Sequence, residues 1–153
     1  MEFDLEVLIT RLHPEAVLPR YAHHGDAGAD LTSVEDLELK PGQRHAVSTG
    51  LAMSLPIGYV ALLHPRSGLA LKHGIGMVNS PGTIDAGYRG ELKVILINHD
   101  PINIFTINKG DRIAQMVIQK VESASFVEVD QLTDSDRGEG GFGSTGVNAK
   151  ASQ

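Results

Sequence analysis

Short runs of apolar or alternating residues, separated by turns rich in glycine and proline, extend over most of the chain. Many short strands with turn residues between them are typical of all-β barrels and sandwiches. Only one segment, Ser67–His73, has a helical pattern, and Gly74 closes it after about two turns. We therefore expect an all-β fold with one short helix. The predicted strands are residues 3–9, 37–39, 46–55, 59–63, 92–98, 102–107, 112–121 and 126–129.

One predicted strand is apolar on both faces. Residues 94–97 read Val-Ile-Leu-Ile, without the polar positions that a half-exposed strand would have. A strand of this kind has to be covered on both sides. In a chain of 153 residues, the second cover can come from another subunit.

The composition changes at about residue 130. Residues 132–146 are rich in glycine, serine, threonine and charged residues and contain few large apolar side chains. A segment with so little to bury stays outside a packed core. We expect a β domain at residues 1–129 and a mobile arm at residues 130–153.

The overall composition narrows the classes of function. The chain has no cysteine, which excludes disulfides, thiolate metal sites and a cysteine nucleophile. Its net charge of −6 argues against a nucleic-acid polymer as partner, but permits a small polyanion held by a few arginines and a divalent metal. The sequence has no leader pattern at its start and no apolar run near the ~20 residues of a membrane span. We expect a cytoplasmic protein without membrane contact.

Residues 82–92 carry the strongest chemical signal. Asp85 follows a Pro-Gly turn and precedes Tyr88 by three residues, with further glycines on either side. We expect a hairpin whose glycines let the backbone approach a small ligand while it presents the acid and the ring. On its own, such a segment is usually an ordinary acidic turn.

Three other segments hold candidate polar groups. Arg66 and Ser67 lie at the start of the predicted helix, where unpaired N–H groups favour phosphate; the alternative is a serine cap beside a solvated arginine. Asp30 follows small residues and would hold metal-bound water, or would belong to an acidic turn. Gln115 is expected on the same strand face as Ile113, where its amide needs a partner in the sheet or in a ligand.

Residues 137–146 gather an arginine, a phenylalanine, two hydroxyl side chains and five glycines. Three of the glycines match G-x-G-x-x-G, but a dinucleotide fingerprint needs a strand before it and a helix after it, so we reject that interpretation. A lid that closes over a bound anion would use all of these groups. The alternative is a plain flexible tail.

Other common chemistries find no support in the sequence. The seven histidines form no metal-binding pattern. Neither a Walker A sequence nor G-x-S-x-G is present, which argues against a P-loop NTPase and an α/β-hydrolase.

Taken in order, residues 27–31, 65–68, 82–92, 112–115 and 137–146 resemble the five motifs of the trimeric dUTP pyrophosphatases (dUTPases). Each motif is weak alone, but five in order over most of the chain are specific. The resemblance implies a β jelly-roll subunit and a homotrimer with three active sites at subunit interfaces, each built from all three chains. It implies hydrolysis of dUTP to dUMP and pyrophosphate with Mg²⁺, by attack of water on the α-phosphorus.

The resemblance also implies roles for single residues. Asp85 matches the general base that orients the attacking water, and Asp30 matches the acid that holds metal-bound water. Tyr88 matches the ring packed against the deoxyribose, where a 2′-hydroxyl would clash. Asn79 and the backbone around Thr83 match the groups that read uracil.

The remaining implied contacts concern the phosphates and the arm. Phe142, followed by Gly143, matches the ring that stacks over uracil. The implied phosphate contacts are Arg66, Ser67, Gly68, Gln115, Arg137, Ser144 and Thr145.

Two rival functions stay open on the sequence alone. A dCTP deaminase, or a bifunctional deaminase–dUTPase, shares the family's fold but needs an acid near C4 of cytosine, and Glu91 is the only candidate. Ammonia release from dCTP would identify it. A non-catalytic trimer would bind nucleotide through Arg66 and Tyr88 and regulate a partner, and it would not need Asp85.

Overall fold

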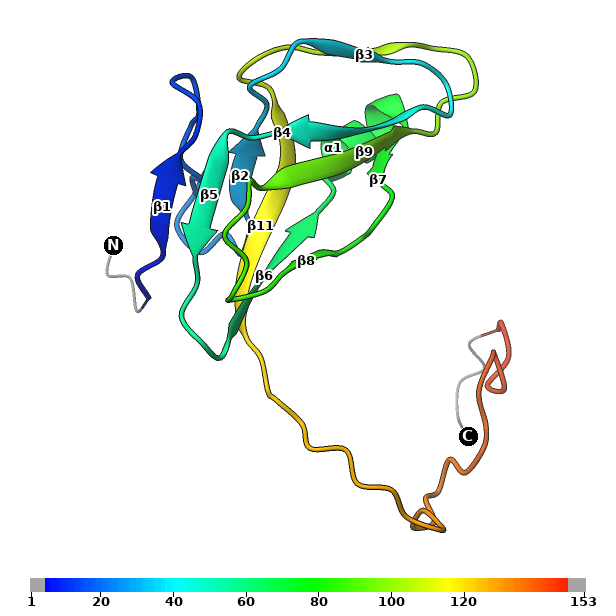
Figure 1. Cartoon of the computed structure of the whole chain (residues 1–153). Helices are drawn as coiled ribbons and strands as arrows, with labels where there is room; N and C mark the ends of the chain where they lie inside the picture. The colour runs from blue at the N-terminus through cyan, green and yellow to red at the C-terminus, as the bar shows by residue number, and fades with distance from the viewer. Residues whose placement is uncertain (1–4, 149–153) are drawn as a thin grey trace. The chain divides into compact units, whose positions relative to one another are not determined.

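The computed structural model describes residues 5–148, and the chain divides into two units, Met1–Ser123 and Ala124–Gln153. All strands and the single helix of the described residues lie in the first unit (Figure 1). The helix is α1 (Ser67–His73). The strands are β1 (Leu8–Arg11), β2 (Ala29–Thr32), β3 (Leu37–Leu39), β4 (Arg44–Ser48), β5 (Leu51–Ser54), β6 (Tyr59–His64), β7 (Ile75–Met77), β8 (Gly82–Ile84), β9 (Lys93–Asn98), β10 (Phe105–Ile107) and β11 (Arg112–Lys120).

Two larger sheets organise the first unit. One has four strands in the order β2-β11-β6-β8, and the other has three in the order β4-β9-β7. The pairs β1-β5 and β10-β3 complete the set, and every pairing is antiparallel. The predicted all-β class with one short helix is confirmed.

The helix begins and ends where the sequence predicts. Arg66 is its N-cap, in an extended conformation. Gly74 ends it in the left-handed region with φ 65°, and its N–H donates to the carbonyl of Ala70 at 3.1 Å. A glycine adopts this conformation without the steric penalty of a Cβ atom.

Strand β11 contains a β-bulge that decides which residues face the same side. Its register against β2 shifts between Arg112, which pairs with Thr32, and Ala114, which pairs with Leu31. Ile113 is the extra residue, and it is buried together with Ala114. The sequence prediction that Ile113 shares a face with Gln115 is therefore wrong, because an extra residue interrupts the two-residue alternation of a strand.

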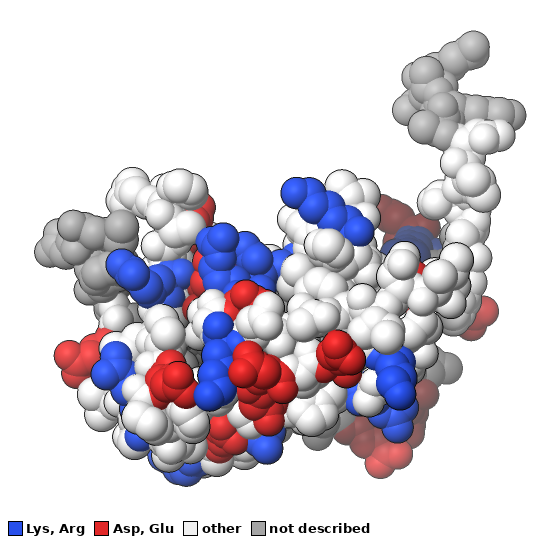
Figure 2. All heavy atoms as spheres, turned by 90° about the horizontal axis from the view of Figure 1, so that it is seen from above, with Lys and Arg blue, Asp and Glu red and all other residues white. Residues whose placement is uncertain are grey.

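The surface of the chain carries mixed charge. Figure 2 shows Lys and Arg side chains beside Asp and Glu side chains across the face in view, rather than one continuous basic patch. Among the described residues, no helix is long and apolar enough to cross a membrane.

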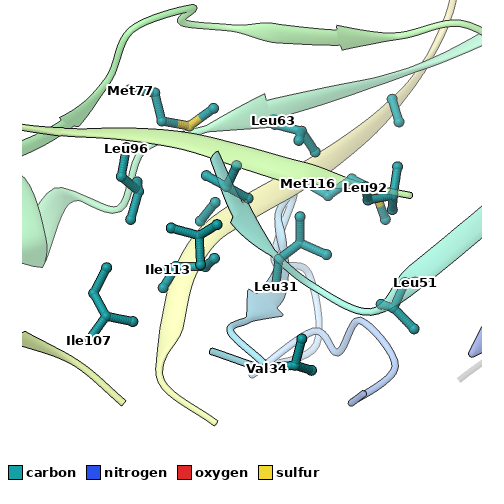
Figure 3. Packing of buried hydrophobic residues seen from close by; sticks show 14 of the residues in the cluster. Leu31, Val34, Leu51, Leu63, Met77, Leu92, Leu96, Ile107, Ile113 and Met116 are labelled. Carbon is teal, nitrogen blue, oxygen red and sulfur yellow. The ribbon is translucent and has the colours of Figure 1, made fainter. Parts of the chain in front are cut away.

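The core of the first unit is built from aliphatic side chains and methionine (Figure 3). Leu31 of β2, Leu63 of β6 and Ile113 of β11 meet Leu96 of β9 and Leu51 of β5 in one cluster, and all five are at most 1% exposed. Full burial of such a side chain contributes about 1.5–3 kcal/mol. This cluster fixes the sheets against each other and therefore the residues at their ends.

Several predicted elements differ from the structure. Residues 82–92 do not form a hairpin, because β8 pairs with β6 whereas β9 pairs with β4 and β7. Residues 46–55 do not form one strand, because a turn at Gly50 with φ 69° separates β4 from β5. Residues 126–129 are not a strand, although their apolar residues, such as Phe126 and Val127, are typical of strands.

The remaining differences concern the edges of elements. Strands β2, β7 and β8, of three or four residues each, have no counterpart among the predicted strands. Of the predicted strand 102–107, only Phe105–Ile107 is extended and paired. The predicted strand 3–9 begins outside the described residues, and the structure has β1 at Leu8–Arg11.

The second unit contains turns and, among its described residues, no strand or helix. Hydrogen bonds from Gly138 to Ser135, from Ser144 to Gly141 and from Gly146 to Gly143 close three of these turns. This unit begins at Ala124, before the boundary at residue 130 expected from composition.

Candidate active site

Five of the predicted site residues line one cleft, which we call the Asp30 cleft. They are Asp30, Arg66, Ser67, Gly68 and Gln115. The cleft has a volume of about 420 Å³. Strand β2 supplies the carboxylate, the start of α1 supplies the arginine and serine, and β11 supplies the amide. Segments distant in sequence thus converge because β2, β6 and β11 are neighbours in one sheet.

The Asp30 carboxylate is shared by two arginines. Its Oδ1 lies 3.4 Å from Nε of Arg66, and its Oδ2 lies 3.3 Å from Nη1 of Arg112. Arg66 also donates from Nη1 to the backbone carbonyl of Arg112 at 3.4 Å. The side chain of Asp30 is 20% exposed, so the carboxylate is partly withdrawn from water. The two guanidinium groups offer several charged N–H donors, which suit an anion, while the carboxylates of Asp30 and Asp26 in the same lining balance their charge.

The amide of Gln115 is held in the same cleft by two features. Its Nε2 donates to the backbone carbonyl of Pro65 at 3.0 Å. Gly28 leaves room for it, because a Cβ atom there would lie 3.0 Å from Cβ and 3.1 Å from Cδ of Gln115. Gln115 also pairs across the ladder with Asp30, so both side chains lie on the same face of the sheet.

Asp85, Thr83 and Tyr88 line a second cleft, which we call the Asp85 cleft. It has a volume of about 400 Å³ and includes Ile95 of β9. Asp85 follows β8 directly and is exposed. A turn closes here, because the N–H of Tyr88 donates to the carbonyl of Asp85 at 3.0 Å. The sequence prediction that this segment presents an acid and a ring agrees with the geometry, although the backbone is a turn between two sheets and not a hairpin.

Glu91 also lines the Asp85 cleft, but its carboxylate is engaged with the backbone. Oε1 accepts the N–H of Gly50 at 3.0 Å, and Oε2 lies 3.6 Å from Nζ of Lys93. The carboxylate therefore braces the turn between β4 and β5. Glu91 is the one acid that the sequence offered for a dCTP deaminase, and its contacts give it a structural role instead.

The other predicted site residues are Asn79 and five residues of the second unit. Asn79 precedes β8 and lines neither cleft, but its Nδ2 would be 3.3 Å from a Cβ at Gly82, so its side chain packs against the start of that strand. Phe142 is fully exposed, with φ 50°. Arg137 donates from Nε to the carbonyl of Gly140 at 2.6 Å. The arm residues expected to contact the nucleotide are Arg137, Phe142, Gly143, Ser144 and Thr145, and all belong to the second unit.

Arg112 is the functional residue that the sequence prediction missed. It lines the Asp30 cleft and pairs with Asp30, although a regular strand would place it on the face opposite Gln115. The bulge at Ile113 brings both to one side. In the sequence, Arg112 follows Asp111 at the start of a strand and is expected to be a solvated charge. Only knowledge of the bulge would have placed its side chain in the cleft.

The possible metal ligands in the Asp30 cleft are oxygen and nitrogen atoms of a few side chains. No group of three or more His, Cys, Asp or Glu side chains among residues 5–148 is arranged to hold a metal ion. A metal at Asp30 would therefore take most of its ligands from water and from a bound molecule.

Comparison with known proteins identifies a single family. The profile of the dUTPase family matches residues 14–146. The chain is 60% identical over 149 residues to a deoxyuridine 5′-triphosphate nucleotidohydrolase of Thermobifida fusca, with 97% of this chain and 83% of the relative covered. It is 57% identical over 152 residues to the protein of the same description from Corynebacterium diphtheriae, with 97% of this chain and 100% of the relative covered.

Solved structures give the same result. A variant of the Staphylococcus bacteriophage 80alpha dUTPase with dUpNHpp superposes with a TM-score of 0.88 at 31% identity, covering 93% of this chain and 99% of that chain. A variant dUTPase from phage phi11 of S. aureus, in which a structural Mg(II) ion is coordinated, has a TM-score of 0.79 at 28% identity, covering 85% and 100%.

Proposed function

This chain belongs to the dUTPase family and hydrolyses dUTP to dUMP and pyrophosphate, and we propose that Asp85 orients the attacking water while the Asp30 cleft binds the phosphates. The observation that carries this proposal is that eight of the predicted residues line two clefts, one with arginines and one with an exposed acid and a ring. The dUTPase variant with dUpNHpp, a dUTP analogue, supports binding of the nucleotide.

Asp85 is the proposed general base. An exposed carboxylate at a closed turn is free to accept a hydrogen bond from water and to hold that water in one direction. Positioning a water molecule for attack on the α-phosphorus needs no covalent nucleophile. The pyrophosphate then leaves with its negative charge on oxygens.

Arg66, Ser67, Gly68 and Gln115 are the proposed phosphate contacts of the first unit. Arg66 is already oriented by Asp30, at 3.4 Å, and Gln115 is oriented by Pro65, at 3.0 Å. Groups that are held in place before the substrate binds stabilise developing charge without reorganising. The guanidinium groups of Arg66 and Arg112 in this cleft favour a phosphate over an uncharged ligand.

Mg²⁺ is the proposed metal, and Asp30 would hold it through bound water. Mg²⁺ prefers oxygen ligands, keeps several waters and is bound by one or two carboxylates together with substrate phosphates. The Asp30 cleft fits this description, because its lining has two carboxylates, Asp30 and Asp26, and the described residues hold no group of three or more His, Cys, Asp or Glu side chains arranged for a metal ion. When bound, the ion would neutralise phosphate charge and polarise the phosphoryl oxygens.

We assign the base and the sugar to the Asp85 cleft. The ring of Tyr88 would pack against the deoxyribose, and Asn79 with the backbone at Thr83 would read uracil. The arm, through Arg137, Phe142, Gly143, Ser144 and Thr145, would close over the nucleotide. Its exposed ring and glycine-rich turns support a segment that orders when ligand binds.

A homotrimer would unite the two clefts. The Asp30 and Asp85 clefts of one chain share no lining residue, which supports a site that takes one cleft from each of two copies. Ile95 and Ile97 of β9 are only half-buried in the single chain, which supports a cover from another subunit.

Mixing inactive variants tests the shared site. Reassembled mixtures of Asp85→Asn and Arg66→Ala chains should regain about a quarter of the wild-type sites, because random assembly pairs an intact Asp85 with an intact Arg66 from another chain. The control mixture of Asp85→Asn with Asp85→Ala should stay inactive, since neither chain supplies an intact Asp85. Equal recovery in both mixtures, or none in either, would contradict the assembly proposed here.

Substrate and base are tested by measuring pyrophosphate release with Mg²⁺ from dUTP, dCTP, dTTP and UTP. Turnover should be confined to dUTP, and Asp85→Asn should lower it by at least about 100-fold while dUTP still binds. Full activity in Asp85→Asn would show that another group orients the water.

A further inference from the structure

We infer that Gly90 sets the position of the Tyr88 ring and thereby the discrimination between deoxyribose and ribose. The inference rests on the proposed function, in which the ring faces the sugar. Gly90 itself lines neither cleft. It would act through Tyr88, as a positioning residue.

The Tyr88 ring lies directly over the backbone of Gly90. A Cβ atom added at Gly90 would lie 2.6 Å from Cζ and 3.0 Å from Cε2 of the ring, and closer still to the hydroxyl oxygen. Carbon atoms in contact are normally about 3.5–4.0 Å apart. The ring therefore occupies a place that exists only because residue 90 has no side chain.

Two hydrogen bonds fix the ring from the other directions. The Tyr88 hydroxyl donates to the carbonyl of Glu91 at 2.9 Å, and the Tyr88 N–H donates to the carbonyl of Asp85 at 3.0 Å. The accepting residue is itself held, because the carboxylate of Glu91 accepts the N–H of Gly50 at 3.0 Å. The ring is thus tied through Glu91 to the turn between β4 and β5.

An added methyl group at residue 90 would move the ring and leave the fold intact. Tyr88 is 45% exposed, so its side chain has open solvent into which it can rotate. The hydroxyl would then lose its bond to Glu91. Because the ring lines the same cleft as Asp85, its displacement would open space beside the sugar and admit a 2′-hydroxyl.

Gly87 provides a matched control in the same turn. A Cβ atom at Gly87 meets nothing within 4 Å, in contrast to Gly90. Neither glycine has a φ in the left-handed region, so alanine fits the backbone at both positions. A difference between the two alanine variants would therefore report the contact with the ring.

The experiment compares kcat/KM for dUTP and for UTP in the full-length protein with Mg²⁺. Gly90→Ala should lower the ratio of dUTP to UTP by about tenfold or more, since a pocket that stops rejecting one small group loses a factor of that order. Gly87→Ala should keep the ratio within about twofold, because it removes no contact. Melting temperatures of both variants should stay close to that of the wild type.

Tyr88 variants separate the possible outcomes. Tyr88→Ala should lower the ratio at least as much as Gly90→Ala does. An unchanged ratio in Gly90→Ala beside a lowered one in Tyr88→Ala overturns the role of Gly90 and leaves that of Tyr88 intact. An unchanged ratio in Tyr88→Ala overturns both, including the proposed sugar contact.

A second variant covers the case in which Gly90→Ala does not fold. Tyr88→Phe keeps the ring but removes its bond to Glu91, so the ratio should fall by about two- to tenfold, the range expected for one hydrogen bond. A wild-type ratio in Tyr88→Phe would then overturn the inference.

Discussion

Replacement of Asp30 by asparagine removes one negative charge from the Asp30 cleft and changes little else in shape. In the structure this carboxylate pairs with Arg66 at 3.4 Å and with Arg112 at 3.3 Å. Without it, two guanidinium groups remain side by side, joined only by the bond from Arg66 to the carbonyl of Arg112. We expect Asp30→Asn to destabilise the fold and to weaken the response to Mg²⁺.

The exposure of the partners sets the size of the stability effect. Asp30 is 20% exposed and Arg66 28%, whereas Arg112 is 55% exposed, so water screens the second pair more than the first. Exposed ion pairs contribute about 0.2–1 kcal/mol each, and the less exposed pair belongs at the upper end of that range. The two pairs together are therefore worth about 1–2 kcal/mol, reduced slightly because the asparagine oxygen still accepts one hydrogen bond.

Urea unfolding at a fixed protomer concentration measures this loss. The difference between wild type and Asp30→Asn should shrink in 1 M salt, where the screening length is about 3 Å. Glu15→Gln is the control, because it breaks the more exposed pair of Glu15 with Lys109 and should therefore destabilise the fold less than Asp30→Asn does. A loss equal to the control, or one that salt does not change, would refute the electrostatic reasoning.

The second readout is activity against Mg²⁺ concentration. Groups that hold a metal through bound water typically contribute 10- to 100-fold in affinity or activity, so the half-activating Mg²⁺ concentration should rise by about that factor in Asp30→Asn. If stability falls but the Mg²⁺ response is unchanged, Asp30 serves only to pair with Arg66 and Arg112 and does not hold the metal.

Three further outcomes are expected. Truncation after Asp136 should leave the circular dichroism of the β domain intact but strongly reduce turnover, because the described residues of the arm contribute none to the core; an unfolded product would make the arm structural. Asn98→Ala should cost about 2–4 kcal/mol in urea unfolding, since it removes the donor to the buried carbonyl of Leu39 and to the partly buried carbonyl of Asn103, and a loss below 1 kcal/mol would contradict this. The N–H groups of Asn103 and Ile102 lower the pKa of Asp100, so its contribution is present above about pH 4 and is lost as the pH falls through the lowered pKa; Asp100→Asn should therefore differ from wild type more at pH 7 than at pH 2.

The sequence predicted which residues gather in a cleft better than it predicted the backbone that carries them. Helix α1 was predicted with its observed bounds, because Gly74 gives an unambiguous end signal. The site residues Asp30, Arg66 and Gln115 do converge in one cleft. The resemblance to the dUTPase motifs identified these residues. No local sequence pattern shows that β2 and β11, which carry two of them, are neighbouring strands.

The incorrect predictions share one physical cause, which is that strand pairing depends on distant residues. Residues 82–92 contain glycines as a hairpin would, but β8 pairs with β6 in one sheet and β9 pairs with β4 in another. In the run 46–55, apolar residues stand on both sides of Ser48-Thr49-Gly50, so the turn at Gly50 interrupts the apolar pattern only briefly. The apolar positions of 126–129 predict a strand, and the single chain offers it no pairing partner among the described residues.

The bulge in β11 has a consequence for transplanting this chemistry into another protein. Arg112 and Gln115 are three positions apart, and on a regular strand an odd spacing sends two side chains to opposite faces. Here the extra residue Ile113 makes an odd spacing behave as an even one, so both reach the Asp30 cleft. A designer who copies the side chains onto an ideal strand would point the arginine into the host core. The backbone irregularity has to be grafted together with the residues it serves.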